Sequence, residues 1–151
     1  MRDAYVLVGV DGSETARIAF NEAVREASWR DASVLALHVA GSPLATGHEF
    51  GHLDLDLVHQ NAKTLLTDEL SEIEKEYVAG FPIHVEPRVS IGHTGTEIMR
   101  IAEEEPVELV VMGSRGLGGF RGLLLGSVTT YLVHHLPCRL MIVPPPERTE
   151  Y

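Results

Sequence analysis

Apolar residues gather in five short runs along the chain, and longer stretches of mixed polarity separate the runs. Most runs lack the strict alternation of a strand with one face in water, which is typical of strands covered on both faces. We therefore expect five strands, at residues 5–10, 34–39, 83–91, 109–112 and 139–143.

The stretches between these strands carry apolar residues at the spacing of an amphipathic helix. The expected stripes consist of Ala16, Phe20, Ala23 and Ala27, then Leu66, Leu70, Ile73 and Tyr77, and finally Val128, Leu132 and His135. A further helix is expected before Pro106, because Thr94 and Glu97 have the spacing of a capping box with Thr94 as the N-cap. Strands and helices therefore alternate along the chain.

Regular alternation of this kind builds an α/β fold, here a single open parallel sheet of five strands with helices on both faces, in a Rossmann-like arrangement. Pro87 lacks the N–H that a central strand needs, so the third strand is expected at an edge and the strand order is expected to be 3-2-1-4-5. Ligands of such sheets bind where neighbouring connections leave in opposite directions. That point lies between strands one and four, which end in Asp11-Gly12-Ser13 and in residues 113–116.

At 151 residues the chain fits one domain, 1–151, in which the segment 41–55 and the tail 145–151 are expected to be flexible. The single cysteine, Cys138, excludes an internal disulfide and is expected to be a small buried hydrophobe. No run approaches the ~20 apolar residues of a membrane span and no export signal is visible, so we expect a cytoplasmic protein without a membrane partner. The net charge of -10 argues against a nucleic-acid partner.

Residues 113–127, which follow the fourth strand, contain six glycines. Between a strand and a helix, glycines let backbone N–H groups approach an anion closely and adopt positive φ at little cost. If Gly126 and Ser127 open the last helix, its N-terminus adds further N–H groups, and Arg115 and Arg121 are the local cations. A polyphosphate with Mg²⁺ suits such a site, and a merely flexible loop is the alternative. The motifs GxxxxGK(S/T) and GxGxxG do not match this loop.

The spacing that does occur is Gly-x2-Gly-x9-Gly-Ser, formed by Gly113, Gly116, Gly126 and Ser127. The first strand and its exit read VLVGVDGSETARIAF, and the last strand reads CRLMIVP. In these three features the chain resembles the universal stress protein family, in its ATP-binding branch, from residue 5 to residue 144.

The resemblance implies a nucleotide site for ATP and Mg²⁺. Asp11 would lie near the ribose or the metal, Val39 and Met112 would wall the adenine, and Ser127 with backbone N–H groups would line the ribose and phosphates. The complete set of candidate binding residues is Asp11, Gly12, Ser13, Val39, Met112, Gly113, Arg115, Gly116, Gly126, Ser127 and Val128. Other roles stay open, because Val39 and Met112 also suit the core and Asp11 also suits an N-cap paired with Glu14. No catalytic residue is assigned.

Several histidines invite other interpretations. Residues 48–52 read HEFGH and match the HExxH zinc motif, but glycines and a proline surround the motif where that motif needs a regular helix. Adventitious metal binding by this loop stays open. His134 and His135 suit the carboxyl end of the last helix. His38, within a buried strand, is expected to be a core or pocket-wall residue rather than a catalyst.

Three functions remain open. The resemblance implies an ATP-binding regulatory protein of the stress response, whose nucleotide state controls contacts in a homodimer or with an unknown regulatory partner. A slow ATP hydrolase or a phosphoryl or adenylyl transferase is one alternative, with Asp11, Ser127, Arg115 and Arg121 as the candidates near the phosphates. A nucleotide-free interaction module is the other. The apolar last strand, residues 139–143, would leave an open sheet edge, so a two-fold homodimer through it is expected, as the resemblance also implies.

Overall fold

The computed structural model describes residues 3–41, 54–116 and 125–146. Strands and helices alternate in them as β1 Tyr5–Gly9, α1 Glu14–Arg30, β2 Ser33–Ala40, α2 Leu55–Glu74, β3 Val85–Ile91, α3 Thr94–Glu104, β4 Val107–Gly113, α4 Ser127–His135 and β5 Arg139–Val143. All five expected strands are therefore confirmed, with bounds that differ from the expected ones by no more than two residues.

The strands form one parallel sheet in the order β3-β2-β1-β4-β5, as expected. β1 and β4 lie side by side at its centre, and Val6 pairs with Leu109. The chain leaves β1 towards β2 on one side and leaves β4 towards β5 on the other, so the crevice between these exits is the ligand position of an open α/β sheet. Pro87 lies on β3, opposite Ala36 of β2, and β3 is an edge strand as its proline predicted.

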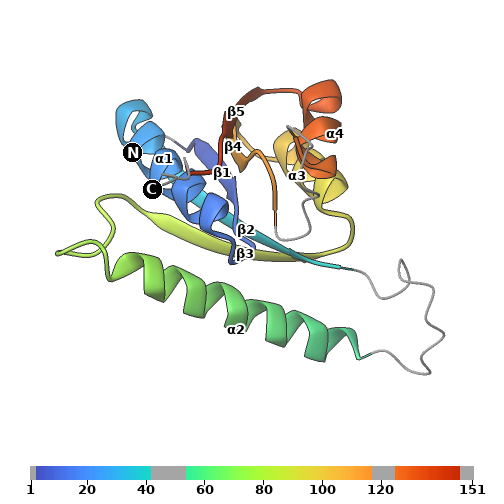
Figure 1. Ribbon diagram of the computed structural model, residues 1–151, viewed down its shortest axis with the longest axis horizontal. Helices are drawn as coiled ribbons and strands as arrows, with labels where there is room; N and C mark the ends of the chain where they lie inside the picture. Colours follow the sequence, from blue (N-terminus) through green and yellow to red (C-terminus); the bar gives the residue numbers. More distant parts are fainter. Residues whose placement is uncertain (1–2, 42–53, 117–124, 147–151) are drawn as a thin grey trace, which may run out of the picture.

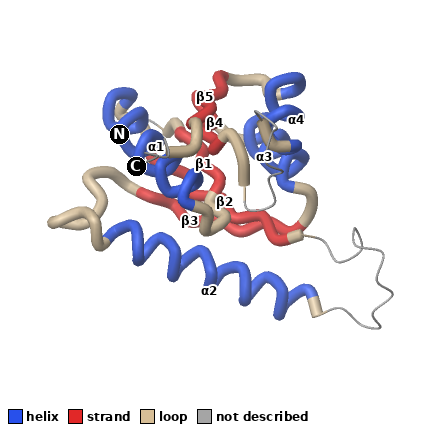
Figure 2. Tube along the Cα trace, viewed as in Figure 1, coloured by secondary structure: helices blue, strands red, loops and turns tan. Residues whose placement is uncertain are grey.

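Helices cover both faces of the sheet, because successive side chains of each strand point to opposite sides. Val6 and Val8 of β1 and Val34 of β2 lie in the core cluster that α1 and α2 cover, whereas Leu7 and Leu35 lie in the cluster that α3 and α4 cover. Figure 1 shows α3 and α4 together on one side of the sheet, away from α1 and α2, and Figure 2 shows the strands between these helices. This double cover explains why the strands are apolar without alternation.

The first two helices bury the expected stripes with one exception. The predicted α1 stripe is buried throughout, and α2 buries Leu66, Leu70 and Ile73. Tyr77 falls outside α2, which ends at Glu74, and its hydroxyl donates to Oδ1 of Asn21 at 2.8 Å. A direct link between α1 and α2 is the ion pair of Arg17 with Glu69, whose Nε and Oε1 are 2.6 Å apart.

Two expectations for the later helices are wrong. Thr94 is not an N-cap, because it already has helical backbone geometry, and His93 occupies the N-cap without a capping hydrogen bond from its side chain to the helix backbone. His135 does not share the buried stripe of Leu132; it is exposed and lies against the ring of Tyr131, with ring centroids 4.5 Å apart. His134 and His135 do occupy the last turn of α4, as expected.

Several expectations fall on residues outside the described ranges. These are the motif at residues 48–52, Arg121, and most of the segments expected to be flexible. Three glycines between Gly116 and Gly126 also lie there, namely Gly118, Gly119 and Gly122. Among the residues that are described, no helix is long and apolar enough to cross a membrane.

Candidate functional site

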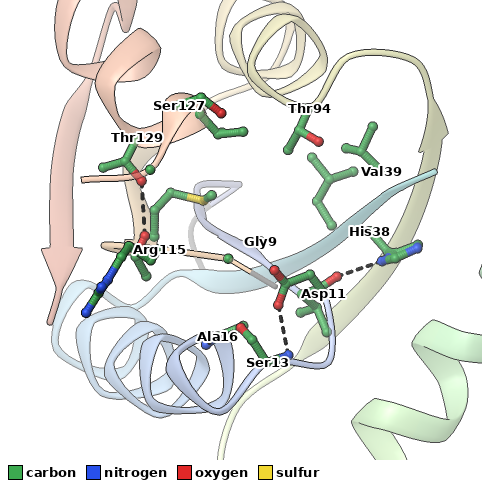
Figure 3. Close-up of a pocket in the computed structure, with 17 residues that line it drawn as sticks. Gly9, Asp11, Ser13, Ala16, His38, Val39, Thr94, Arg115, Ser127 and Thr129 are labelled. Atoms are coloured by element: carbon green, nitrogen blue, oxygen red, sulfur yellow. Dashed lines mark hydrogen bonds between the residues drawn. The ribbon is translucent and has the colours of Figure 1, made fainter. Parts of the chain in front are cut away.

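A cavity of about 260 Å³ opens at the carboxyl ends of β1, β2 and β4, beside the N-termini of α1, α3 and α4 (Figure 3). Ten of the candidate residues line it, namely Asp11, Ser13, Val39, Met112, Gly113, Arg115, Gly116, Gly126, Ser127 and Val128. Gly12 does not line the cavity; with φ at +81° it makes the turn between Asp11 and α1. The fold thus brings two segments about a hundred residues apart in sequence to one cavity.

Part of the cavity lining is apolar, and we call the space beside Met112 and Val39 the apolar slot. The Met112 side chain lies across Gly9, where an added Cβ would be 3.0 Å from the Met112 sulfur. Leu37 and Val39 of β2 continue the lining. Val39 and Met112 also pack against the core cluster under α3 and α4, so both roles considered for them apply together. The slot suits a flat apolar group such as a purine base.

The Asp11 carboxylate is held by the start of α1. Its Oδ1 accepts a hydrogen bond from the Ser13 N–H at 2.9 Å, while the Ser13 hydroxyl accepts one from the Ala16 N–H at 3.1 Å. Ser13 is therefore the N-cap of α1, and the alternative considered for Asp11, an N-cap paired with Glu14, is wrong. The physical reason is the turn at Gly12, which places Asp11 before the cap and leaves it on the cavity wall.

Two of the three motif glycines are needed for close approach rather than for positive φ. A Cβ on Gly113 would be 2.7 Å from Cγ2 of Thr15, and a Cβ on Gly116 would be 2.8 Å from Oδ2 of Asp11. Neither residue has positive φ. Gly126 is different, since its φ is -71° and an added Cβ would have its nearest neighbour at 3.5 Å, an ordinary contact.

Two hydrogen bonds hold the ends of the glycine loop together. The Gly126 N–H donates to the carbonyl of Ser114 at 2.6 Å, and the Thr129 hydroxyl donates to the carbonyl of Gly113 at 3.1 Å. Ser114 in turn donates its N–H to the Val143 carbonyl at 2.7 Å, at the end of β5. The start of α4, the end of β4 and the end of β5 are thus tied at one residue.

The N-terminus of α4 faces the cavity without a side-chain cap. Gly126 is the N-cap, and the first bond inside the helix runs from the Thr130 N–H to the Gly126 carbonyl at 3.0 Å. The N–H groups of Ser127, Val128 and Thr129 therefore have no partner within the helix, and such groups bind anions readily. Arg115 also lines the cavity and has no ion-pair partner among the described residues. Together, these N–H groups and the Arg115 guanidinium place hydrogen-bond donors and one positive charge at the cavity wall of an acidic chain.

Sequence reasoning missed several residues of this cavity: Gly9, Val10, Ala16, Leu37, Thr94 and Thr129. His38 also lines it, which agrees with the expected wall role. The period of two along a strand could have found Leu37 from Val39, because both side chains lie on the same face of β2. Thr94 carried no such signal, since its place depends on how α3 packs.

The described part of the chain bears on metal and thiol chemistry, whereas the motif at residues 48–52 lies outside it. In the described ranges, no three His, Cys, Asp or Glu side chains gather closely enough to hold a metal ion by themselves. Cys138 is half-buried beside the core, and burial raises the pKa of its thiol above its ordinary value. A thiol of this kind stays protonated at neutral pH, which agrees with the structural role expected for it.

Related proteins carry the same fold and the same family assignment. The model of the universal stress protein family matches residues 5–144. A universal stress protein of Mycolicibacterium smegmatis is 31% identical over 143 residues, which are 93% of this chain but 45% of the relative. A Staphylococcus saprophyticus protein named as a universal stress protein is 29% identical over 140 residues, 91% of this chain and 81% of the relative. The chain thus spans under half of the first relative and most of the second.

Solved structures extend the comparison. UspA of Lactobacillus plantarum superimposes with a TM-score of 0.74 at 24% identity, covering 95% of this chain and 99% of that one. An Archaeoglobus fulgidus universal stress protein in complex with dAMP superimposes with a TM-score of 0.67 at 22% identity, covering 95% of this chain and 99% of that one. A universal stress protein in complex with cAMP superimposes with a TM-score of 0.69 at 22% identity, covering 93% of this chain and 96% of that one. The fold and the family match over nearly the whole length agree, and the chain belongs to the universal stress protein family.

Proposed function

We propose that this chain is an ATP-binding regulatory protein, and that its nucleotide state controls contacts in a homodimer or with a protein partner. Two family members of the same fold hold adenine nucleotides, dAMP in one case and cAMP in the other. The observation that carries the proposal for this chain is the uncapped N-terminus of α4, which lines the same cavity as the apolar slot.

The cavity suits the parts of a nucleotide in a definite order. Adenine would lie in the slot between Val39 and Met112, and the ribose would lie near Asp11. The phosphates would accept hydrogen bonds from the first N–H groups of α4 and from Arg115. Mg²⁺ is usually held by one or two carboxylates together with the phosphates of its nucleotide, and Asp11 offers a carboxylate at the cavity wall. The donor set of this chain therefore fits ATP with Mg²⁺.

The regulatory part of the proposal rests on the link between the cavity and the sheet edge. Ser114 accepts a hydrogen bond from the N-cap of α4 and donates one to the last residue of β5. β5 is an edge strand, and an apolar edge strand invites pairing with a second copy. An anion that draws the start of α4 towards itself would act, through Ser114, on the end of this edge.

The binding part is tested by calorimetric titration of nucleotide-stripped protein with Mg-ATP and with AMP, on the parent and on a matched pair of variants. Gly126→Asp and Gly126→Asn both fit, because the position has ordinary φ and space for a Cβ, and both residues are good N-caps. They differ in charge at the phosphate position. We expect micromolar binding by the parent, about -8 kcal/mol, and at least about tenfold more loss in Gly126→Asp than in Gly126→Asn.

Equal affinities of the two variants would show that no phosphate lies at α4. Absence of binding by the parent would overturn the proposal and favour a nucleotide-free interaction module. The regulatory part is tested by sedimentation of the parent with and without Mg-ATP. Thermodynamic linkage requires that nucleotide changes the dimer dissociation constant if dimerisation changes nucleotide affinity. An unchanged dimer constant would leave a nucleotide binder whose dimer is not under nucleotide control.

A further inference from the structure

His38 is a polar residue of the cavity to which the proposed function gives no task. It lies near the end of β2, is half-buried and lines the cavity (Figure 3). Its Nδ1 is 2.7 Å from the carbonyl oxygen of Val10. A carbonyl oxygen can only accept, so Nδ1 carries the proton and donates it.

This hydrogen bond lies at the point where β1 and β2 stop pairing. The parallel register ends with Gly9 opposite Leu37, and one more main-chain bond follows, from the Val10 N–H to the Leu37 carbonyl at 2.8 Å. A ladder continued by one step would bring the next β2 backbone N–H to the Val10 carbonyl. The imidazole of His38 supplies the donor in its place. The N–H and the carbonyl of Val10 are thus bound by two consecutive residues of β2, Leu37 and His38.

The Val10 carbonyl shares a planar peptide group with the N–H of Asp11. Holding that carbonyl therefore fixes the direction in which the chain enters Asp11. The next residue, Gly12, has φ at +81° and gives the chain great freedom at this turn. On the other side, the Ser13 N–H holds one oxygen of the Asp11 carboxylate. Main chain and side chain of Asp11 are therefore fixed by two separate contacts, and His38 makes the first.

We infer that His38 is a positioning residue for the nucleotide site, acting through the Val10 carbonyl to aim the Asp11 carboxylate at its ligand. The inference rests on the proposed function, since it assigns a supporting residue to the same site. His38 acts as a hydrogen-bond donor in this role, and neither its charge nor contact with the nucleotide is needed.

The test uses two replacements of similar shape. The Asn side chain carries an N–H donor at about the distance of Nδ1 from the backbone, whereas Leu of similar size carries none. We expect His38→Leu to weaken Mg-ATP binding about five- to tenfold in calorimetry, the usual effect of one lost hydrogen bond, and His38→Asn to regain most of the affinity. His59→Leu, at an exposed position on α2, controls for the loss of a histidine as such.

A double-mutant cycle separates positioning of Asp11 from a general loosening of the fold. If His38 acts through Asp11, His38→Leu has little effect on affinity once Asp11→Asn is present, so the two changes are not additive. Additive losses, or equal losses in the Leu and Asn variants, would overturn the inference while leaving the proposed function intact. Absence of nucleotide binding by the parent would instead overturn both. Thermal unfolding without nucleotide shows that each variant is folded at the titration temperature.

Discussion

The second carboxylate oxygen of Asp11 lies over the backbone of Gly116 so closely that a Cβ there would be 2.8 Å away from it. Asp11 comes from the end of β1 and Gly116 from the loop after β4, so this contact joins the two strand exits that form the cavity. Glycine at 116 therefore makes room for the side chain of a residue far away in the sequence.

Gly116→Ala should move the Asp11 carboxylate and weaken Mg-ATP binding about tenfold, with little loss of stability, because the contacted atom ends a flexible side chain. Calorimetry and thermal unfolding of the same samples test the two parts separately. Gly41→Ala is the matched control, since a Cβ there would meet no atom within 4 Å. An unchanged affinity in Gly116→Ala would contradict a role of the Asp11 position in binding.

Gly113→Ala should act mainly on stability. The new Cβ would be 2.7 Å from Cγ2 of Thr15 on α1, and overpacking of this kind costs about 1–3 kcal/mol of unfolding free energy. Thr15→Ser removes that methyl group, so the double variant should recover most of the loss in urea unfolding. If Gly113→Ala is equally destabilising when combined with Thr15→Ser, the destabilisation has another origin than this contact.

Ile142→Lys tests the homodimer expected through β5. Leu140 and Met141 pack against the two core clusters, whereas Ile142 of the same edge strand belongs to neither. A charge at position 142 should therefore leave the core intact. In analytical ultracentrifugation at tens of micromolar, we expect the parent to be a dimer and Ile142→Lys to be a monomer. Val78→Lys adds the same charge at an exposed position away from the strand and should leave the dimer intact. A monomeric parent would refute the dimer outright.

Acid stability should depend on Tyr5. Burial raises the pKa of Glu86. Hydrogen bonds from the Tyr5 hydroxyl and from Arg88 together lower it by more, so the pKa lies below its ordinary value of 4.5. A carboxyl with a lowered folded-state pKa stabilises the fold above its unfolded-state pKa, and this contribution is lost as the pH falls through the folded-state value.

Tyr5→Phe should therefore cost up to about 1 kcal/mol of unfolding free energy near neutral pH and less once Glu86 is protonated. Urea unfolding of parent and variant at about pH 7 and about pH 3.5 measures the difference. Other carboxyls titrate in both proteins and cancel in the comparison. A deficit of the same size at both pH values would mean that the Tyr5 hydroxyl acts without regard to the charge of Glu86.

The sheet could be predicted from the sequence because its determinants are local. Unalternating apolar runs show that strands are covered on both faces, and one proline inside the third run places it at an edge. The alternation of elements then leaves few topologies. Even the point between β1 and β4 where the cavity lies follows from the order of strands.

The caps and part of the cavity could not be predicted, because they depend on contacts between distant elements. Asp11 and Ser13 are both good capping residues, and the turn at Gly12 decides that Ser13 caps α1. The glycine spacing pointed to a loop that lines the cavity, but the residues that approach Gly113 and Gly116 most closely, Thr15 and Asp11, come from the segment that links β1 to α1 and from the start of α1. Thr94 lines the cavity only because of how α3 packs on the sheet.

The two edges of the sheet differ in a way that limits how far it can grow. β3 carries Pro87 between Glu86 and Arg88, and proline and charge both discourage a further strand, whereas β5 is apolar after its first residue, Arg139, and has no proline. If two copies join through β5 about a two-fold axis, their sheets form one continuous sheet, and both of its outer edges are proline-bearing β3 strands. Such a pair is closed, so an exposed sheet edge can serve assembly here without leading to filaments.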